Sequence, residues 1–346
     1  MKISHNWLTH FIELPETPET ISEILTQTGL EVESVSKIEK IKGGLKGLII
    51  GEVMSCIPHP NADKLKLTQV DVGSDDLISI VCGAANISAG QKVAVAPVNC
   101  LIYPIKGEPF QIKKAKIRGE VSQGMICAED EIGLGSSHEG IMVLTTDYAN
   151  GTPLNKIYES EEDIVYEIGL TPNRGDATSH LGTARDLKAY FNRSLTLPVL
   201  KDFDLSHPRN PIKVTVEDHE GALRYSGVTL RGIKVAASPD WLKWKLKAID
   251  LEPINNIVDI TNYVLHCLGQ PMHAFDADEV GSLIIVKRLP TDTPFTTLDG
   301  KERKLSDQDL MICNTKGGMC LAGVFGGQKS GVTNETTDIF LESCLL

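Results

Sequence analysis

The amino-acid sequence predicts a multidomain α+β protein in which an antiparallel barrel is inserted into a small, split α+β domain. Its 346 residues exceed what one ordinary hydrophobic core accommodates. Helical spacing of apolar residues is lost between residues 40 and 151, where short alternating runs replace it, and returns afterwards. We therefore expect three domains, formed by residues 1–39 with 152–200, by residues 40–151, and by residues 207–346.

Both halves of the split domain carry helix signals. Pro18 suits the first position of a helix, apolar residues then recur at helical spacing, and Gly29 ends it. Residues 30–35 alternate as a strand does. After the barrel, Asp176 or Ser179 can cap a second helix with a side-chain oxygen. Because each half is small for a domain, we expect the two to pack together.

The inserted region and the last region differ in their patterns. In the inserted region, alternating runs between turn residues are typical of a small, closed antiparallel barrel. These runs are residues 48–53, 65–72, 78–82, 92–98 and 113–117. The last region instead mixes helices with strands, which is an α+β pattern. Its expected strands are 212–216, 225–230 and 283–287, and its helices lie near 239–250 and 256–268.

Composition and charge limit the classes of function. The net charge of −12 argues against bulk, nonspecific nucleic-acid binding, which requires neutralisation of phosphates, but it leaves room for a local basic face. No apolar run approaches the roughly 20 residues that cross a bilayer, and the N-terminus lacks a signal-peptide pattern, so we expect a cytoplasmic protein without a membrane partner. The eight cysteines are scattered without C-x-x-C, which predicts reduced thiols and no zinc site.

Three segments of the barrel region combine turn residues with polar side chains, and a basic cluster lies among them. The segments are HPNADKL at 59–65, VCGAAN at 81–86 and SQGM at 122–125. Each alone is compatible with ordinary turn chemistry. Lys113, Lys114, Lys116 and Arg118 either contact phosphates or form a solvated strand face. Residues 40–150 hold eleven basic and twelve acidic residues, so we expect only weak, auxiliary contact with nucleic acid.

The stretch of residues 254–276 is the richest in candidate chemistry. Gly269 can cap the helix that its apolar stripe predicts, and Pro271 prevents the continuation of that helix, which leaves His273 in a turn. The stripe consists of residues 257, 260, 261, 264, 265 and 268. Asn262 lies opposite the stripe, so Asn262 and His273 either contact a ligand or only tie the turn down by hydrogen bonds. The motifs H-E-x-x-H and G-x-S-x-G are absent, which argues against metal and serine chemistry.

A second candidate feature runs from residue 321 to Glu342. The small residues of LAGVFGG at 321–327 let a planar group approach the backbone closely, although a glycine-rich hairpin turn is the alternative. No G-K-[ST] follows, so the segment is not a phosphate-binding loop. Glu342 lies in a strand-like apolar run, where it is either exposed or an acceptor in a pocket.

Several of these segments resemble, in the same order, the β subunit of bacterial phenylalanyl-tRNA synthetase. The three barrel segments are similar to the tRNA-binding OB-fold module of several aminoacyl-tRNA synthetases. Further landmarks are LTPNRGD at 170–176, RYSG at 224–227, TLDG at 297–300 and LES at 341–343. The resemblance covers essentially the whole chain but only the N-terminal half of the longer family subunit. It implies a split B1 domain, an OB-fold domain and a B3/B4 domain truncated at its C-terminal end.

The resemblance implies an editing site that hydrolyses tyrosine wrongly attached to the phenylalanine tRNA. It makes His273 and Asn262 the catalytic candidates and Glu342 the residue that reads the tyrosine hydroxyl. The other pocket residues that it implies are Thr261, Pro271, Ala322 and Gly323. A site that hydrogen-bonds the hydroxyl separates tyrosine from phenylalanine better than an apolar pocket does. His273 would position or deprotonate water, and backbone N–H groups near Gly323 would stabilise the oxyanion.

The resemblance also implies partners and cofactors outside this chain. The full enzyme would be an α2β2 heterotetramer whose α subunit joins phenylalanine to its tRNA with ATP and Mg²⁺. This chain would bind the tRNA through the barrel and would itself hold no cofactor or metal. Two alternatives remain open, namely a non-catalytic tRNA-binding and assembly module and an unrelated hydrolase with an OB-fold appendage.

Overall fold

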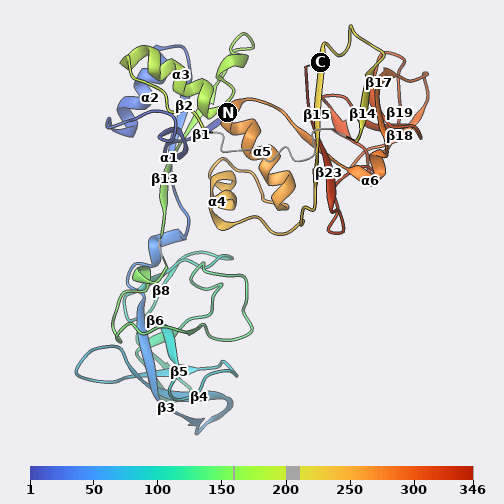
Figure 1. The fold of residues 1–346 in the computed structure, drawn as a ribbon. Helices are drawn as coiled ribbons and strands as arrows, with labels where there is room; N and C mark the ends of the chain where they lie inside the picture. Colours follow the sequence, from blue (N-terminus) through green and yellow to red (C-terminus); the bar gives the residue numbers. More distant parts are fainter. Residues whose placement is uncertain (159, 200–210, 346) are drawn as a thin grey trace. The chain divides into compact units, whose positions relative to one another are not determined.

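A computed structural model describes residues 1–346 except residues 159, 200–210 and 346 (Figure 1). The chain forms two compact units, one of residues 37–163 and one of residues 1–36 with 164–346. The predicted multidomain α+β fold with an inserted barrel is confirmed. The boundaries expected at residues 200 and 207 lie outside the described residues, and the division of the larger unit into two domains stays a prediction.

The unit of residues 37–163 is an antiparallel sheet that nearly closes into a barrel. Its strands run in the order β11-β6-β3-β4-β5, with β12 also beside β6. They are β3 (Ile49–His59), β4 (Ala62–Asp71), β5 (Ile78–Cys82), β6 (Lys92–Pro97), β11 (Gly124–Ile126) and β12 (Val143–Leu144). The two edges of the sheet meet where the amide of Gln123 donates to the carbonyl oxygen of Ser79 at 2.8 Å. Val53, Val70 and Val95 are fully buried in its core.

Short elements complete this unit. Strand β7 (Leu101–Ile102) pairs with β8 (Phe110–Gln111), and β9 (Ala115–Ile117) pairs with β10 (Glu120–Ser122). The 3₁₀ turns are η1 (Lys42–Leu45) and η2 (Leu154–Lys156).

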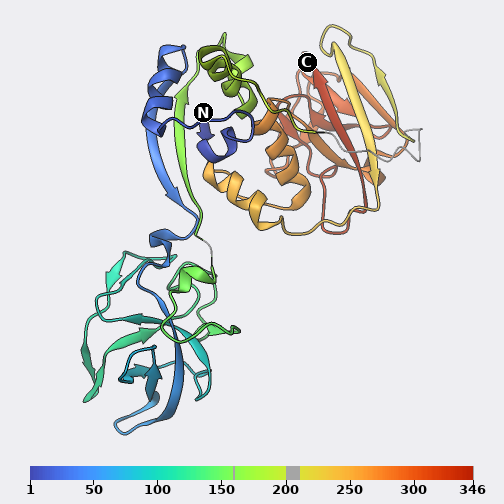
Figure 2. The same ribbon diagram turned by 60° about the vertical axis from the view of Figure 1, so that its left-hand side comes forward.

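The N-terminal part of the larger unit is a three-stranded sheet packed with helices (Figure 2). The sheet order is β1-β13-β2, with β1 (Lys2–Ser4), β2 (Glu31–Glu39) and β13 (Glu162–Gly169). The helices are α1 (His5–Leu8), α2 (Pro18–Gln27) and α3 (His180–Phe191), with the turn η3 (Gly175–Ala177). The side chains of Thr17 and Ser179 cap α2 and α3. Trp7, Leu25 and Tyr166 are buried in a core that both sequence segments share.

The C-terminal part of this unit contains two sheets with a hydrophobic core. The larger sheet has the order β14-β17-β20-β21-β22, and the smaller has the order β15-β23-β16. The larger sheet comprises β14 (Lys213–Val216), β17 (Leu283–Arg288), β20 (Leu310–Cys313), β21 (Gly318–Leu321) and β22 (Phe325–Gly326). The smaller sheet comprises β15 (Arg224–Arg231), β16 (His273–Asp276) and β23 (Asp338–Leu345). Strands β18 (Pro294–Thr296) and β19 (Glu302–Lys304) pair separately. Phe275, Phe340 and Ile312 are fully buried in the core.

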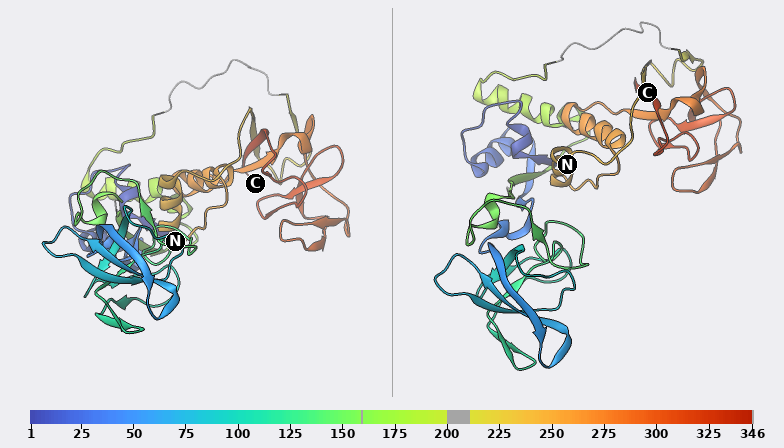
Figure 3. Two further views of the ribbon diagram at one scale, coloured as in Figure 1. Left: turned by 90° about the horizontal axis from the view of Figure 1, so that it is seen from below. Right: turned by 60° about the horizontal axis from the view of Figure 1, so that its bottom comes forward.

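Helices α4 (Asp240–Ala248) and α5 (Asn256–Leu268) occupy the ranges expected from the sequence, and a short α6 (Ala277–Val280) follows (Figure 3). Gly269 caps α5 with φ of 83°, as predicted. The expected apolar stripe is wrong in part, because Ile260 and Leu268 are exposed. Helix α5 is buried on two sides, since Ile257 packs with strand residues while Cys267 packs in the core that holds Trp7.

Candidate active site

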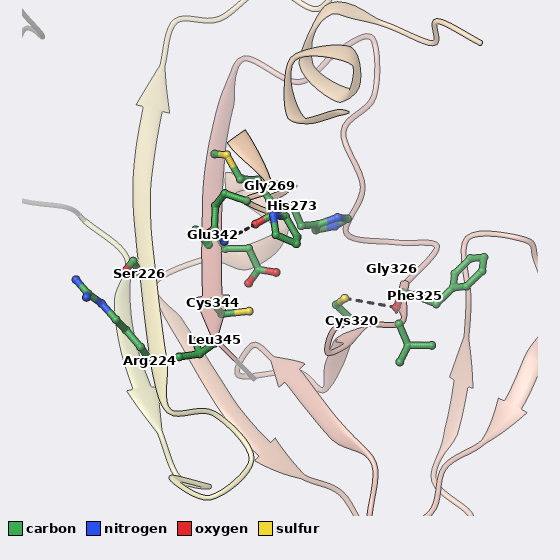
Figure 4. Close-up of a pocket in the computed structure, with 16 residues that line it drawn as sticks. Arg224, Ser226, Gly269, His273, Cys320, Phe325, Gly326, Glu342, Cys344 and Leu345 are labelled. Carbon is green, nitrogen blue, oxygen red and sulfur yellow. Dashed lines mark hydrogen bonds between the residues drawn. The ribbon is translucent and has the colours of Figure 1, made fainter. Parts of the chain in front are cut away.

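A cavity of about 880 Å³ lies between the β15-β23-β16 sheet and the hairpin of β21 and β22 (Figure 4). Four residues that the sequence assigned to a pocket, Pro271, His273, Gly323 and Glu342, line it. The other lining residues are Arg224, Ser226, Gly269, Gln270, Met272, Cys320, Val324, Phe325, Gly326, Ser343, Cys344 and Leu345. The structure therefore brings together segments that are far apart in the sequence.

Glu342 reaches the cavity because side chains alternate along β23. Phe340 and Glu342 lie on the same face of the strand, where Phe340 is fully buried and Glu342 is 5% exposed. Of the two expectations for this carboxylate, exposed or buried, the buried one is observed. Figure 4 shows the carboxylate directed into the space between β23 and the segments that carry Cys320 and Gly326.

The surroundings of Glu342 keep its carboxyl partly protonated near neutral pH. Burial raises the pKa of Glu342 to about 7. The hydroxyl of Tyr225 donates a hydrogen bond to Oε2 of Glu342, which stabilises the ionised form and lowers this pKa in part. Because a carboxylate accepts through both oxygens, Oε1 is available to a ligand.

His273 lies directly opposite Glu342 in the ladder between β16 and β23. It was expected in a turn, but the chain after Pro271 pairs with β23, so His273 is the first residue of a strand. Its ring meets Phe275 edge to face, with 4.5 Å between ring centroids. Burial lowers the pKa of His273, which keeps the imidazole neutral and able to accept a proton. No hydrogen bond from its ring nitrogens to another described residue is found.

Glycines leave the space into which these side chains fit. A Cβ on Gly326 would stand 3.2 Å from Cε1 of His273 and 2.9 Å from Cδ1 of Leu298. A Cβ on Gly227, which lies opposite Glu342, would overlap the ring of Phe340 at 2.1 Å. Gly323 has a φ of 69°, a conformation that favours glycine. Close packing therefore requires glycine at positions around the cavity.

The remaining candidates lie outside the lining of the cavity. Ala322 packs at the edge of the hydrophobic core, and its amide donates to the carbonyl oxygen of Leu310 at 2.9 Å. Thr261 is buried on α5, where its hydroxyl donates to the carbonyl oxygen of Val258 at 2.7 Å. Asn262 is partly buried on the same helix. Because none of these three residues lines the cavity, their roles in binding or catalysis stay predictions.

The sequence-based assignment missed Tyr225, Cys320 and Cys344. Tyr225 pairs with Cys344 across β15 and β23, so both side chains lie on the face that carries Glu342. The alternation of β15 is a usable signal, but the register between these strands is not visible in either strand alone. Burial raises the pKa of Cys320 to about 12 and that of Cys344 to about 11, so neither thiol is an activated nucleophile.

Within the described ranges, no three or more His, Cys, Asp or Glu side chains are grouped so that they could hold a metal ion. Among the helices of the same ranges, none combines the length and apolar character needed to cross a membrane.

The basic cluster of the barrel lies beside all three turn segments. Lys113, Lys114, Lys116 and Arg118 are all exposed, on and next to the β9–β10 hairpin. That hairpin contacts the first segment, because a ring nitrogen of His59 lies 3.2 Å from the carbonyl oxygen of residue 117. It also leads into the third segment, where the Ser122 hydroxyl accepts from the amide of residue 81 at 3.1 Å. The predicted segments therefore meet on one side of the barrel.

Two domain families match the chain. The family described as a putative tRNA binding domain matches residues 48–153, and the family described as the B3/4 domain matches residues 221–346. The first covers the barrel strands β3 to β12, and the second covers the cavity with both Tyr225 and Glu342. The two matches thus coincide with the two places where the sequence located candidate residues.

Full-length relatives cover both regions at once. The chain is 52% identical to the phenylalanine–tRNA ligase β subunit of Bacteroides fragilis and 51% identical to that of Porphyromonas gingivalis, each over 99% of this chain and 42% of the relative. A crystal structure of an N-terminal fragment of the phenylalanyl-tRNA synthetase β subunit from Pyrococcus horikoshii aligns with 16% identity and a TM-score of 0.30, over 53% of this chain and 56% of that chain.

The chain spans less than half the length of the curated relatives it matches. Within that span the match is nearly continuous, and it includes both the barrel and the cavity. Over nearly its whole length, the chain is therefore similar to phenylalanine–tRNA ligase β subunits.

Proposed function

We propose that this chain binds tRNA through its barrel and that the cavity at Glu342 and His273 hydrolyses tyrosine from mischarged phenylalanine tRNA. One observation carries the proposal, namely a buried carboxylate and a neutral imidazole that face each other across a ladder and line the same cavity. The B3/4 and tRNA-binding matches support the same assignment.

Selectivity would come from the Oε1 atom of Glu342. Tyrosine differs from phenylalanine by one hydroxyl, which can donate to this acceptor, whereas phenylalanine leaves Oε1 of the buried carboxylate without a partner at a cost of about 1–3 kcal/mol. The apolar side chains of Val324 and Phe325 at the cavity suit the aromatic ring of either amino acid. The discrimination therefore rests on the hydroxyl and not on the fit of the ring.

Hydrolysis requires an oriented water and a place for the negative charge. The imidazole of His273 is neutral and lines the cavity, so it can orient or deprotonate water. The amide of Val324 already donates to the carbonyl oxygen of Leu321 at 3.0 Å, which leaves the amide of Gly323 as the oxyanion donor in this turn. An aminoacyl ester is already activated, so these groups suffice without a metal.

The chain would act as part of a larger cytoplasmic assembly. We infer an α2β2 heterotetramer in which the α subunit attaches phenylalanine to its tRNA with ATP and Mg²⁺, because the relatives are named β subunits of that ligase. The alternative is a non-catalytic module that binds tRNA and supports assembly, with the cavity as scaffold only.

The test of the editing site is hydrolysis of tyrosyl and phenylalanyl esters of phenylalanine tRNA by the native assembly. Glu342→Ala is expected to reduce the preference for the tyrosyl ester about ten- to a hundredfold. His273→Ala is expected to slow both hydrolyses about a hundredfold. Glu302→Ala, which removes an exposed carboxylate, is the control. Wild-type clearance of the tyrosyl ester by both site variants would favour the non-catalytic alternative.

The test of the barrel is a charge reversal that keeps the fold. Changing Lys113, Lys114 and Lys116 to Glu is expected to lower tRNA affinity at least tenfold in low salt and to flatten its salt dependence, because fewer phosphates are neutralised. Three other exposed lysines of the same unit, changed to Glu together, give a control of equal charge; they are Lys42, Lys46 and Lys106. Equal losses in both triple variants would show that the cluster is only a solvated face.

A further inference from the structure

The acceptor proposed to read tyrosine already holds a tyrosine of the chain itself. The hydroxyl of Tyr225 donates to Oε2 of Glu342, and within the described residues it is the only hydrogen-bond partner of that carboxylate's side chain. The ring of Tyr225 packs against the hydrophobic core that contains Phe340. The phenol is therefore fixed by packing and not by the carboxylate alone.

We infer that Tyr225 is a positioning residue that holds the Glu342 carboxylate in one orientation, with only Oε1 left for the hydroxyl of a ligand. The inference rests on the proposed function, because it explains how the editing site would read tyrosine. It adds a specificity-determining residue that neither the domain matches nor the sequence pattern assigns.

The geometry explains why the bond needs a partner on β15. A glutamate side chain has several rotatable bonds, so burial alone does not choose its orientation. The residue directly opposite Glu342 on β15 is Gly227, which has no side chain to offer. Tyr225, one pleat away on the same face, is long enough to span the diagonal to the carboxylate.

The groups around Glu342 make the hydrogen bond from Tyr225 the main stabiliser of its ionised carboxylate. The titratable groups facing Glu342 are Tyr225 on β15, His273 on β16, Cys320 on β21 and Cys344 on β23. All four are uncharged at neutral pH, because burial lowers the pKa of His273 and raises the pKa of Tyr225 and of both thiols. The guanidinium of Arg224 also lines the cavity, but Arg224 pairs with Leu345 and so lies on the opposite face of the ladder between β15 and β23. Only the hydroxyl of Tyr225 stabilises the carboxylate, so its loss would raise the pKa of Glu342 above about 7.

Selectivity should then depend on pH in a way that Tyr225 sets. An ionised Glu342 accepts a hydrogen bond from the tyrosine hydroxyl more strongly than a protonated one does. In the wild type, preference for the tyrosyl ester should rise as the pH passes through 7. In Tyr225→Phe the same rise should occur about one pH unit higher. The loss of one hydrogen bond to a charged carboxylate raises the pKa of that carboxyl by about this amount.

The experiment measures the ionisation of Glu342 and the selectivity of hydrolysis separately, in the native assembly. Difference infrared spectra against Glu342→Gln report the carboxyl titration, and the ratio of tyrosyl to phenylalanyl ester hydrolysis is followed from pH 6 to 8.5. For Tyr225→Phe we expect a midpoint about one unit higher, an approximately fivefold lower ratio at pH 7, and a ratio that stays below the wild-type value at pH 8.5, where the carboxylate is ionised but no longer held in one orientation. Tyr263→Phe removes a hydroxyl from a partly buried ring that does not line the cavity, and it should change neither quantity.

The outcomes separate this inference from the proposed function. An unchanged midpoint and an unchanged pH profile in Tyr225→Phe overturn the inference, even if the wild type edits. A shifted midpoint without any wild-type preference for the tyrosyl ester supports the coupling of Tyr225 to Glu342 but overturns the proposed function. If Tyr225→Phe does not fold, 3-fluorotyrosine at position 225 replaces it. This stronger donor of nearly the same shape should lower the midpoint, and no shift would overturn the inference.

Discussion

Two histidines of the larger unit, His180 fully buried and His273 partly buried, show how similar electrostatics can accompany different roles. Burial lowers the pKa of both His180 and His273. His180 is fully buried, its Nε2 accepts from the amide of Ser4 at 3.0 Å, and its Nδ1 lies 2.7 Å from the carbonyl oxygen of His266. Its ring also stacks on Trp7, with 4.0 Å between centroids. Every polar atom of this ring is used by the fold.

His273 differs in what its nitrogens contact. It packs edge to face on Phe275, but its ring makes no hydrogen bond to the described residues, and it lines the cavity opposite Glu342. A depressed pKa therefore does not by itself locate a functional histidine. The distinguishing feature is a neutral ring whose nitrogens face a cavity instead of being paired within the fold.

The largest expected difference between the two histidines is in stability. His180→Ala should lower the free energy of unfolding by about 4 kcal/mol. The substitution leaves the Ser4 amide and the His266 carbonyl without their hydrogen-bond partner and removes the stack on Trp7. His273→Ala should cost about 1 kcal/mol or less in the same measurement, since no hydrogen bond is lost. Chemical denaturation at pH 7 compares them, and equal losses would contradict the division into a structural and an available histidine.

Sequence patterns predicted the elements better than the contacts between them. Alternation placed β5 at residues 78–82, as observed, because each strand has one buried face that the pattern reports. Gly269 likewise marked the end of α5. These features are local, so a single stretch of sequence contains the information that determines them.

The candidate site depends on register and packing, which local patterns do not contain. The meeting of His273 with Glu342 requires a specific pairing of β16 with β23, and only the family resemblance pointed to it. Tyr225 was missed for the same reason, because its partner lies on another strand. Thr261 and Asn262 were assigned to the pocket by the family resemblance, and their roles stay predictions, because α5 is buried on two sides and neither residue lines the cavity.

A smaller effect sharpens the same comparison through the pH dependence of stability. The pKa of Glu342 is raised from 4.5 to about 7, so the unfolded state loses its proton first and the contribution of this group to stability falls as the pH rises from about 4.5 to 7. Glu342→Gln removes that penalty, and its stability relative to wild type should increase over this range by at most about 3 kcal/mol and then stay constant.

His180 should act in the opposite direction, which allows the two regions to be separated in one titration. Its pKa is lowered from 6.5 to about 3, so the unfolded state binds a proton first and stability falls as the pH drops below about 6.5. This acid limb should persist in Glu342→Gln, because the side-chain contacts of His180 do not involve Glu342. If the free energy of unfolding of Glu342→Gln instead changed with pH as that of the wild type does from pH 4.5 to 7, the carboxylate would be solvated. A solvated carboxylate could not discriminate a buried hydroxyl, and the comparison of an available site at the cavity with a structural contact at His180 would fail.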